Sequence, residues 1–305
     1  MAELNLTPQH HLFSINPWHH QGGDMSGRLE KTVLITGASS GIGRATAIYM
    51  AQRGFSVIGT SRSLDRLQSL KDEAARSGLS IAAVELDPNR DEAVDSVLPD
   101  LISEHGGIDV LVNNAGYILW GPVGSLSVAE LKQQFETNLF ACQRLIRAVL
   151  PGMIEGGHGT IINVSSVTGR LATPFTGAYA ASKFALEGLS EALRMELWPL
   201  GVRVALVEPG LIRTDLQATQ TVAREADSDG SPYAPYVARF RSRHSRFERI
   251  GRDPVKVARV IYKVARARRP AFRNVVGIEA SLGIFGKRWL PERLFQAILT
   301  RATMR

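Results

Sequence analysis

A tyrosine and a lysine four positions apart, Tyr179 and Lys183, are the residues of this sequence whose types and spacing most directly suggest chemistry. On a helix, positions i and i+4 lie on the same face. A phenol with a pKa of ~10 is a poor base at neutral pH, but a nearby ammonium stabilises the phenolate and lowers that pKa. Tyr179 could then act as a general acid or base. The same spacing also occurs on ordinary exposed helices, so the pair needs support from its surroundings.

A glycine-rich stretch, Thr36 to Gly43, has the features of a phosphate-binding turn. The residues before it form a β-branched run typical of a buried parallel strand, and the apolar residues after it recur at helical spacing. Glycine adopts positive φ without steric cost, and it leaves amide groups bare at the helix start, where an anion is favoured. We interpret the stretch as a dinucleotide-binding turn; a Gly/Ser-rich surface loop is the alternative. The residues assigned to it are Gly37, Ser39, Ser40, Gly41, Ile42 and Gly43.

Strands and helices are predicted to alternate from residue 31 to residue 207. Strict alternation implies right-handed crossovers and a parallel sheet covered by helices on both faces. The predicted fold class is α/β, with a single doubly wound Rossmann-type parallel sheet of about seven strands and a helical C-terminal extension. The predicted strands are 31–36, 56–60, 80–86, 109–113, 159–165, 202–207 and 275–276. One predicted helix begins near residue 42, and the others cover 64–77, 90–104, 127–150, 178–198 and 253–268.

In such a sheet the ligand lies beyond the carboxyl ends of the strands, so the residues just after each strand are candidates for cofactor binding. Ser61 and Arg62 follow the second strand, and no acidic residue occurs there before Asp65. An arginine at this place accommodates the 2′-phosphate of NADP, whereas a carboxylate would favour NAD. The sequence therefore predicts NADP (NADPH) as cofactor, and Arg44, beside the last glycine of the turn, could help to bind the phosphate. The alternative is that Arg62 is simply exposed at a helix start.

The ends of three further strands supply the remaining cofactor candidates. A carboxylate after the third strand could accept a hydrogen bond from the adenine amino group, and small residues after the fourth let the backbone approach the ribose. A bent backbone and a threonine hydroxyl after the sixth could bind the nicotinamide carboxamide. Each of these stretches also fits an ordinary turn. The residues are Asp87, Asn114, Ala115, Gly116, Pro209, Gly210, Ile212 and Thr214.

The motifs together, in order and with fitting separations, resemble the short-chain dehydrogenase/reductase family; they are the glycine turn, Asn113-Asn114-Ala115-Gly116, Asn138, Ser166, Tyr179 with Lys183, and Pro209-Gly210. The resemblance covers roughly residues 31–215 and implies a catalytic tetrad. Tyr179 would exchange a proton with the substrate oxygen, while Lys183 would bind the nicotinamide ribose and lower the pKa of Tyr179. Ser166 would hold the carbonyl or hydroxyl, and Asn138 would position a water of the proton relay. Hydride would pass between the nicotinamide and the substrate carbon.

The segments 113–122 and 164–175 look like those of family members that act on lipophilic substrates, such as 17β-hydroxysteroid or retinol dehydrogenases. This implies an NADP-dependent oxidoreductase for a hydrophobic ketone, aldehyde or secondary alcohol. Two alternatives remain: a 3-oxoacyl-carrier reductase, whose basic tail would face an acidic carrier protein, and a non-catalytic NADP-binding regulator. The complete set of four catalytic residue types argues against the regulator, which has no need of them.

Composition narrows the classes of protein further. The chain has 305 residues, of which 44% are hydrophobic, and no apolar run approaches the ~18 residues of a membrane span. The single cysteine, Cys142, excludes an intramolecular disulfide and a Cys-based zinc cluster; it suits a reducing compartment, and we expect a cytoplasmic protein. No metal site is predicted, because nothing would fix the geometry of the four histidines near the N-terminus, which are His10, His11, His19 and His20.

The positive charge lies in the last third of the chain. Residues 1–212 hold 16 Lys and Arg against 21 Asp and Glu, whereas residues 213–305 hold 20 against 8. Such a segment could attract an anionic ligand, a membrane surface or nucleic acid, or it could be a solvated face without a partner. Because aromatic residues are sparse among the arginines, no nucleic-acid partner is expected.

The chain is predicted to consist of a disordered extension, residues 1–27, and a single catalytic domain, residues 28–305. Met25 could equally be the start of translation. Residues 213–250 form a long connection of the kind that often makes a substrate lid. Residues 278–305 are predicted to form a C-terminal helical extension, of which 278–299 is amphipathic. This segment is expected first of all to pack on the core; it could also close a hydrophobic pocket, dock a partner subunit or make peripheral contact with a membrane. The family resemblance implies a homodimer or homotetramer.

Overall fold

The computed structural model describes residues 30–213, 220–226 and 231–304; of residues 220 and 243–250 only the backbone is considered. The predicted N-terminal extension, residues 1–27, lies outside the described residues. The strands are β1 Thr32–Thr36, β2 Ser56–Ser61, β3 Ile81–Glu85, β4 Val110–Asn113, β5 Ile118–Trp120, β6 Gly159–Val164, β7 Val202–Pro209, β8 Gln220–Val222 and β9 Arg273–Val276. The helices are α1 Gly41–Ala51, α2 Leu64–Arg76, α3 Asp91–Glu104, α4 Val128–Phe135, α5 Ala141–Glu155, α6 Gly177–Leu197, α7 Ala234–Ile250, α8 Pro254–Arg266, α9 Ile278–Trp289 and α10 Glu292–Met304.

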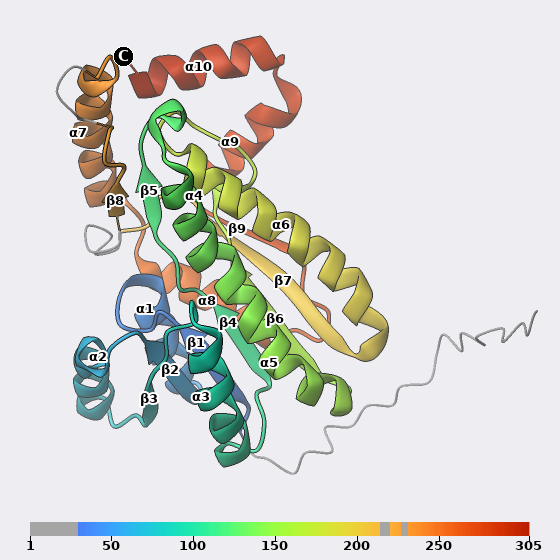
Figure 1. Cartoon of the computed structure of the whole chain (residues 1–305). Helices are drawn as coiled ribbons and strands as arrows, with labels where there is room; N and C mark the ends of the chain where they lie inside the picture. Colours follow the sequence, from blue (N-terminus) through green and yellow to red (C-terminus); the bar gives the residue numbers. More distant parts are fainter. Residues whose placement is uncertain (1–29, 214–219, 227–230, 305) are drawn as a thin grey trace, which may run out of the picture.

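The centre of the molecule is a sheet of seven parallel strands in the order β3-β2-β1-β4-β6-β7-β9 (Figure 1). The order reverses between β1 and β4, which pair in parallel with Val33 opposite Val110. This is the doubly wound sheet predicted from the alternation of elements, and the prediction is confirmed. At the reversal point the chain leaves neighbouring strands in opposite directions, so a crevice opens beyond their carboxyl ends.

Helices cover both faces of the sheet because side chains along each strand alternate between two cores. On β1, Val33 and Ile35 pack in a core built with α1, α2 and α8, whereas Leu34 packs in a second core built with α3, α5 and the end of α6. These three residues are completely buried. Buried on both faces, the strand reads as a continuous apolar run, which explains why its position could be predicted.

Three elements differ from the sequence-based prediction. The helix predicted over 127–150 is interrupted by a π-helical turn, Glu136–Phe140, between α4 and α5. The segment 213–250, predicted as a long connection, contains β8, which pairs in parallel with β5 in a separate two-stranded sheet. Pro291 divides the predicted C-terminal amphipathic segment into α9 and α10, because a proline in a helix interior removes a hydrogen bond and clashes with the preceding turn.

A third hydrophobic cluster lies beside the carboxyl edge of the sheet and joins β5, β8, α6 and α7. Phe240 of α7 stacks against Trp120 of β5 at 4.6 Å between ring centroids, and against Phe175 at 5.3 Å. In Figure 1, α7, α10 and α9 form a cap over this edge. Part of the segment predicted as a lid therefore packs directly above the end of the sheet where a ligand would bind.

Candidate active site

A cavity of about 760 Å³ lies at the carboxyl ends of the strands. A volume of this size can hold a large organic ligand. Of the residues predicted to bind a cofactor, 16 line the cavity: Gly37, Ser39, Ser40, Gly41, Ile42, Ser61, Arg62, Asp87, Asn114, Ala115, Gly116, Tyr179, Lys183, Pro209, Gly210 and Ile212. Gly43 is buried behind the turn rather than in the cavity wall, and Thr214 lies outside the described residues.

The glycine turn has the backbone geometry that its sequence predicts. Gly37 and Gly41 have φ angles of +65° and +52°, which side-chain-bearing residues rarely adopt. A Cβ on Gly43 would lie 2.2 Å from the Gly37 carbonyl oxygen and 2.5 Å from Asn114 Nδ2, so only glycine fits there. Close packing at Gly43 holds the turn against the neighbouring strand end, with the start of α1 facing the cavity. A helix start without an acidic residue in its first turn suits an anionic group.

Asn114 and Thr36 join the ends of β4 and β1. The Thr36 hydroxyl accepts hydrogen bonds from the backbone N–H groups of Asn114 at 3.0 Å and Ala115 at 2.9 Å. Asn114 Nδ2 in turn donates to the Thr36 carbonyl oxygen at 2.9 Å. These bonds fix the floor of the cavity. Thr36 was not predicted to hold the asparagine turn, although it lies at the end of the strand before the glycines.

Two arginines lie on the rim of the cavity that follows β2. Arg62, which precedes α2, is exposed and lines the cavity, and Arg66 lines it from the first turn of α2. Arg66 was not predicted to lie at the site. Arg44 does not line the cavity: its Nη2 lies 2.5 Å from Glu73 Oε2 and donates to the Ser69 carbonyl at 3.2 Å. The structure therefore gives no support to Arg44 as a second phosphate ligand.

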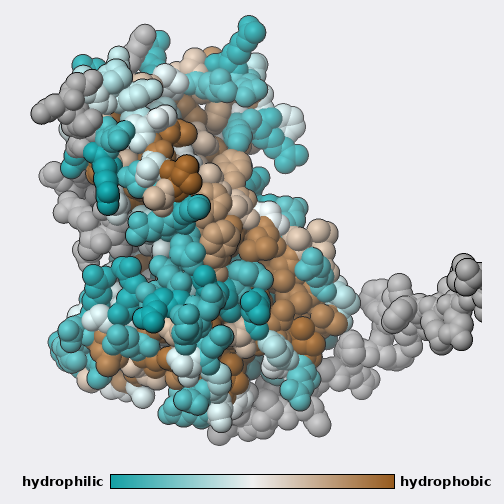
Figure 2. Space-filling model, viewed as in Figure 1, coloured by the Kyte–Doolittle hydropathy of each residue, from teal (hydrophilic) through white to brown (hydrophobic). Residues whose placement is uncertain are grey.

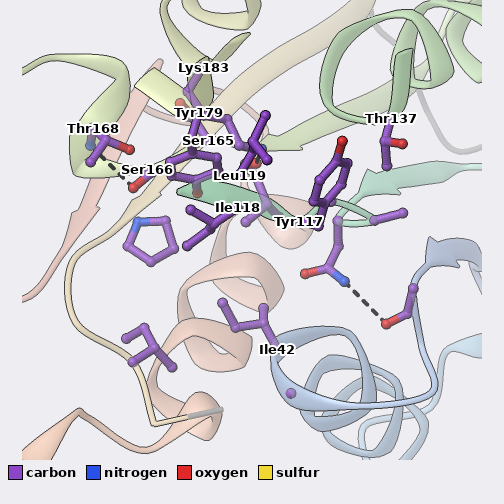
Figure 3. A pocket seen from close by; sticks show the side chains of 18 of the residues that line it. Ile42, Tyr117, Ile118, Leu119, Thr137, Ser165, Ser166, Thr168, Tyr179 and Lys183 are labelled. Atoms are coloured by element: carbon purple, nitrogen blue, oxygen red, sulfur yellow. Dashed lines mark hydrogen bonds between the residues drawn. The ribbon is translucent and has the colours of Figure 1, made fainter. Parts of the chain in front are cut away.

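Ser166, Tyr179 and Lys183 come together at the far side of the same cavity (Figure 3). Tyr179 and Lys183 lie one turn apart on α6, with Lys183 Nζ 5.8 Å from the centroid of the tyrosine ring. Lys183 is 5% exposed, and its ammonium donates to the Val164 carbonyl oxygen at the end of β6 at 2.9 Å. Ser166 begins the short 3-10 turn after β6 and accepts from the backbone N–H of Thr168 at 3.2 Å. The phenol thus faces a hydroxyl and an ammonium across one small space.

The electrostatics of the pair differ from the prediction. Burial raises the pKa of Tyr179, and hydrogen bonding with Ser166 and Thr168 only partly opposes this rise. Burial also lowers the pKa of Lys183, against the opposing influence of Cys142 and Glu187. The expectation that Lys183 brings the pKa of Tyr179 below its ordinary value is therefore wrong for the protein chain alone. Desolvation disfavours the charged form of each group. At this separation, the attraction between phenolate and ammonium is too weak to offset that cost.

Asn138 lies in the π-helical turn between α4 and α5 and is completely buried. Its Oδ1 accepts from the Tyr117 backbone N–H at 3.1 Å, and its Nδ2 donates to the Tyr117 carbonyl and to Ser182 Oγ, both at 3.1 Å. A Cβ on Gly116 would lie 3.0 Å from Asn138 Oδ1 and 3.8 Å from Lys183 Nζ, so this glycine lets the three elements meet. π-Helical turns inside α-helices occur frequently at functional sites.

The half of the cavity beyond Tyr179 is largely apolar. It is lined by residues of β5, the 3-10 turn after β6, α7 and α10, and none of these was assigned to the site from the sequence. The signal was the apolar run after the fourth strand, which was noted only as a resemblance. The residues are Tyr117, Ile118, Leu119, Trp120, Val167, Leu171, Phe240 and Leu299.

The family of the chain follows from comparison with known proteins. Residues 31–225 match the model of the short chain dehydrogenase family. The chain belongs to the short-chain dehydrogenase family. The resemblance drawn from the glycine turn, the strand ends and the Tyr179–Lys183 pair is confirmed. Members of this family are oxidoreductases that interconvert alcohols and carbonyl compounds with a nicotinamide cofactor.

Individual relatives extend the match over most of the chain. A 3-ketodihydrosphingosine reductase of Bacteroides thetaiotaomicron is 35% identical over 88% of this chain and 96% of its own length. Retinol dehydrogenase 8 of Bos taurus is 38% identical over 80% of each chain. A metagenomic short-chain oxidoreductase, solved in complex with NADP, is 29% identical, with a TM-score of 0.64 over 81% of this chain and 96% of its own. The protein is therefore an enzyme of the dehydrogenase/reductase class.

Two further findings concern membranes and metals. Within residues 30–213, 220–226 and 231–304, no helix combines the length and apolar character needed to cross a bilayer. In the same ranges, no three His, Cys, Asp or Glu side chains are placed to hold a metal ion together.

Proposed function

We propose that this protein is an NADP-dependent oxidoreductase that acts on the carbonyl or hydroxyl carbon of a hydrophobic ketone, aldehyde or secondary alcohol. The observation that carries the proposal is that one cavity is lined by two chemically different groups of residues and also by Tyr179 and Ser166. The first group offers bare backbone and cationic side chains, and the second, which we call the substrate half, offers aromatic and aliphatic side chains. A polar cofactor and an apolar substrate would meet at the phenol.

Proton transfer is assigned to residues of this chain. Tyr179 donates a proton to the substrate oxygen during reduction and accepts it during oxidation. Ser166, placed across from the phenol, donates a hydrogen bond to the same oxygen and orients it. Lys183 favours the phenolate once a proton has left, because its ammonium is buried beside the ring and cannot be screened by water. Asn138 is assigned to hold a water that resupplies the proton, with Oδ1 as the atom that still has acceptor capacity.

The bound cofactor would supply the hydride, and the residues around the glycine turn would hold it. The start of α1 would bind the pyrophosphate, and Asp87 would accept from the adenine amino group. Arg62 and Arg66 would bind the 2′-phosphate, which supports NADP over NAD. Lys183 would hold the nicotinamide ribose, and Pro209, Gly210 and Ile212 would support the nicotinamide from the end of β7. Thr214 stays a predicted ligand of the carboxamide. The NADP found in the metagenomic relative supports the same choice of cofactor.

The substrate class follows from the apolar wall and from two relatives. Trp120 and Phe240 are at least nine-tenths buried against each other, so this wall is preorganised rather than assembled by the ligand. The names of the two relatives, 3-ketodihydrosphingosine reductase and retinol dehydrogenase 8, refer to substrates with long apolar chains. We propose that residues 213–250 act as the cover of this substrate half.

Two alternative functions make different demands on the site. A 3-oxoacyl-carrier reductase would need an acidic carrier protein to dock on the basic C-terminal third. A non-catalytic NADP-binding regulator would bind the cofactor without turnover. The test follows nicotinamide absorbance with NADPH and NADH over a panel of long-chain ketones, retinoids, steroids, acyl thioesters and small ketones. Its result distinguishes the proposed oxidoreductase from these two alternatives. Turnover restricted to carrier-linked thioesters supports the first alternative, and cofactor binding without any turnover supports the second.

A homodimer or homotetramer is proposed from the surface of α5 and α6. In Figure 2, hydrophobic side chains gather over the part of the molecule where α5 and α6 lie in Figure 1. Phe140, Ile154, Phe184 and Met195 are among the exposed large apolar residues of this region. A contiguous apolar surface of this kind is typical of an interface. A cytoplasmic location is proposed from the single, buried thiol of Cys142.

A further inference from the structure

Helix α9 carries its large apolar side chains on the outside. Ile278, Leu282, Phe285 and Trp289 are exposed at 66%, 64%, 62% and 66%. Their spacing of four, three and four residues puts all of them on one stripe of the helix. An ordinary surface helix buries such a stripe in the core and exposes polar residues. Here the stripe faces outward over three turns, and Phe285 and Trp289 lie in ring contact at 6.2 Å between centroids.

The inward side of α9 is made of small residues, which explains why the stripe cannot be buried by turning the helix. Ala280 is 2% exposed, and a Cβ on Gly283 would lie 3.1 Å from Leu171 in the cavity wall. A Cβ on Gly286 would lie 3.5 Å from the ring of Phe295 on α10. Turning α9 would bring Leu282 or Phe285 toward Leu171, to which even a Cβ on Gly283 would approach to 3.1 Å. The outward direction of the stripe is therefore fixed by packing.

The inner faces of the same two helices form part of the substrate half of the cavity. Ala280 and Gly283 of α9, together with Leu299 and Thr303 of α10, line it. Helix α10 also exposes Leu294 and Ile298, each by 49%, one turn apart. The two helices thus line the cavity with one face and expose apolar side chains on the other.

The charge beside the stripe is positive. Between residues 278 and 304 the basic residues are Lys287, Arg288, Arg293 and Arg301, and the acidic ones are Glu279 and Glu292. Glu279 is neutralised by Arg252, which donates two hydrogen bonds to its Oε2 at 3.2 and 3.3 Å. Arg288 lies over the Trp289 ring, 5.7 Å from its centroid. An aromatic and aliphatic stripe bordered by arginines matches the interface of an anionic bilayer, where apolar groups enter the acyl boundary and cations meet the headgroups.

We propose that α9 and α10 dock on an anionic membrane surface through this stripe and take the hydrophobic substrate from the lipid phase into the cavity beneath them. The docking itself needs only the stripe and the adjacent basic residues. The delivery of substrate rests on the proposed function. A second copy of the chain is the competing occupant, but the excess of positive charge beside the stripe would then face itself across a two-fold contact.

The test is co-sedimentation of the full-length protein with vesicles of phosphatidylcholine alone or mixed with phosphatidylglycerol. We expect binding to the anionic vesicles that weakens with salt. The double variant Phe285→Ser, Trp289→Ser should bind at least about tenfold less, because two large apolar side chains no longer enter the interface. Arg288→Gln should bind about fivefold less. The matched control is Val123→Ser, Val128→Ser, which removes two apolar side chains of similar exposure, 63% and 67%, away from α9 and α10 and should bind as wild type does.

Turnover of a water-soluble ketone by the same variants keeps this test separate from the proposed function. The Phe285, Trp289 variant should turn over a soluble ketone as wild type does and lose activity only toward a long-chain ketone presented in vesicles. Wild-type protein that stays in the supernatant with both vesicle types would overturn the docking. Loss of self-association in the Phe285, Trp289 variant, without vesicle binding by wild type, would assign the stripe to a second copy instead. If vesicles bind but no ketone turns over, the docking stands and the proposed function fails.

Discussion

Replacement of the buried Glu208 by glutamine should change how the stability of the protein depends on pH. Glu208 lies in β7 and is completely buried, with Oε2 3.5 Å from Arg170 Nη1 and Oε1 3.5 Å from Arg273 Nε. A second carboxylate, Glu187, shares Arg273 at 3.1 Å. Burial, and then the charge of Glu187, raise the pKa of Glu208 from 4.5 to about 7, although Arg170 and Arg273 oppose the rise. In the unfolded chain the carboxyl would keep its ordinary pKa.

The sign of the effect follows from the two pKa values. Below the unfolded value both states are protonated at this position, and Glu208 contributes nothing to pH dependence. As the pH rises toward 7, the unfolded chain loses the proton more readily, so the folded state is progressively destabilised. Above pH 7 the loss of unfolding free energy no longer changes with pH, and its size, set by the pKa difference, is about 3 kcal/mol. Glu208→Gln keeps the shape without titrating, so its free energy of unfolding relative to wild type should rise by about this amount over the same interval.

The assay is urea denaturation of wild type and variant at several pH values between about 4.5 and 8. Glu191→Gln is the matched control, because Glu191 contacts the same Arg273 at 3.0 Å from an exposed position. An exposed ion pair contributes at most about 1 kcal/mol, so this control should show only a small change. Parallel curves for wild type and Glu208→Gln would refute the reasoning, since they would mean that Glu208 releases its proton equally easily in the folded and unfolded chains.

Two further predictions concern the glycine turn and the choice of cofactor. Gly43→Ala should lower the free energy of unfolding by about 1–3 kcal/mol, because the added Cβ meets Gly37 O at 2.2 Å; Gly188→Ala, with no atom within 4 Å of its Cβ, should raise it by about 0.5–1 kcal/mol in the same urea titration. Equal effects of the two alanines would contradict the packing argument. Arg62→Asp should lower the ratio of kcat/KM for NADPH to that for NADH by at least about tenfold, since a charge-assisted hydrogen bond is lost and repulsion is added. An unchanged ratio would remove Arg62 as the phosphate ligand.

The parts of the fold that could be predicted are those specified by local pattern. The β-branched run of β1 is buried on both faces, and the glycines after it need positive φ at Gly37 and Gly41, so both features are visible in the sequence. The parts that could not be predicted depend on tertiary contact. Strand β8 is three residues long and gains its hydrogen bonds only from β5, far away in the chain. The π-helical turn at Asn138 keeps the composition of a helix, so pattern alone predicts a continuous one.

In the candidate site, too, some residues could be predicted from local pattern and others depend on tertiary contact. Residues directly after strands were predicted because topology alone brings strand ends to one edge. The apolar wall was missed, because Phe240 and Leu299 reach the cavity from distant helices. The pKa of Tyr179 was predicted in the wrong direction, because spacing reveals the neighbouring ammonium but not the burial that outweighs it.

The central claim is that Tyr179 exchanges a proton with the substrate oxygen between the two halves of the cavity. The most direct test is kcat of Tyr179→Phe for reduction of a long-chain ketone at saturating NADPH, with binding of NADPH followed by its fluorescence. The phenyl ring fills the same space but carries no proton to donate. We predict that NADPH binding is retained and that kcat falls by about 10²–10⁴-fold. A kcat within a few-fold of wild type would contradict the assignment of Tyr179.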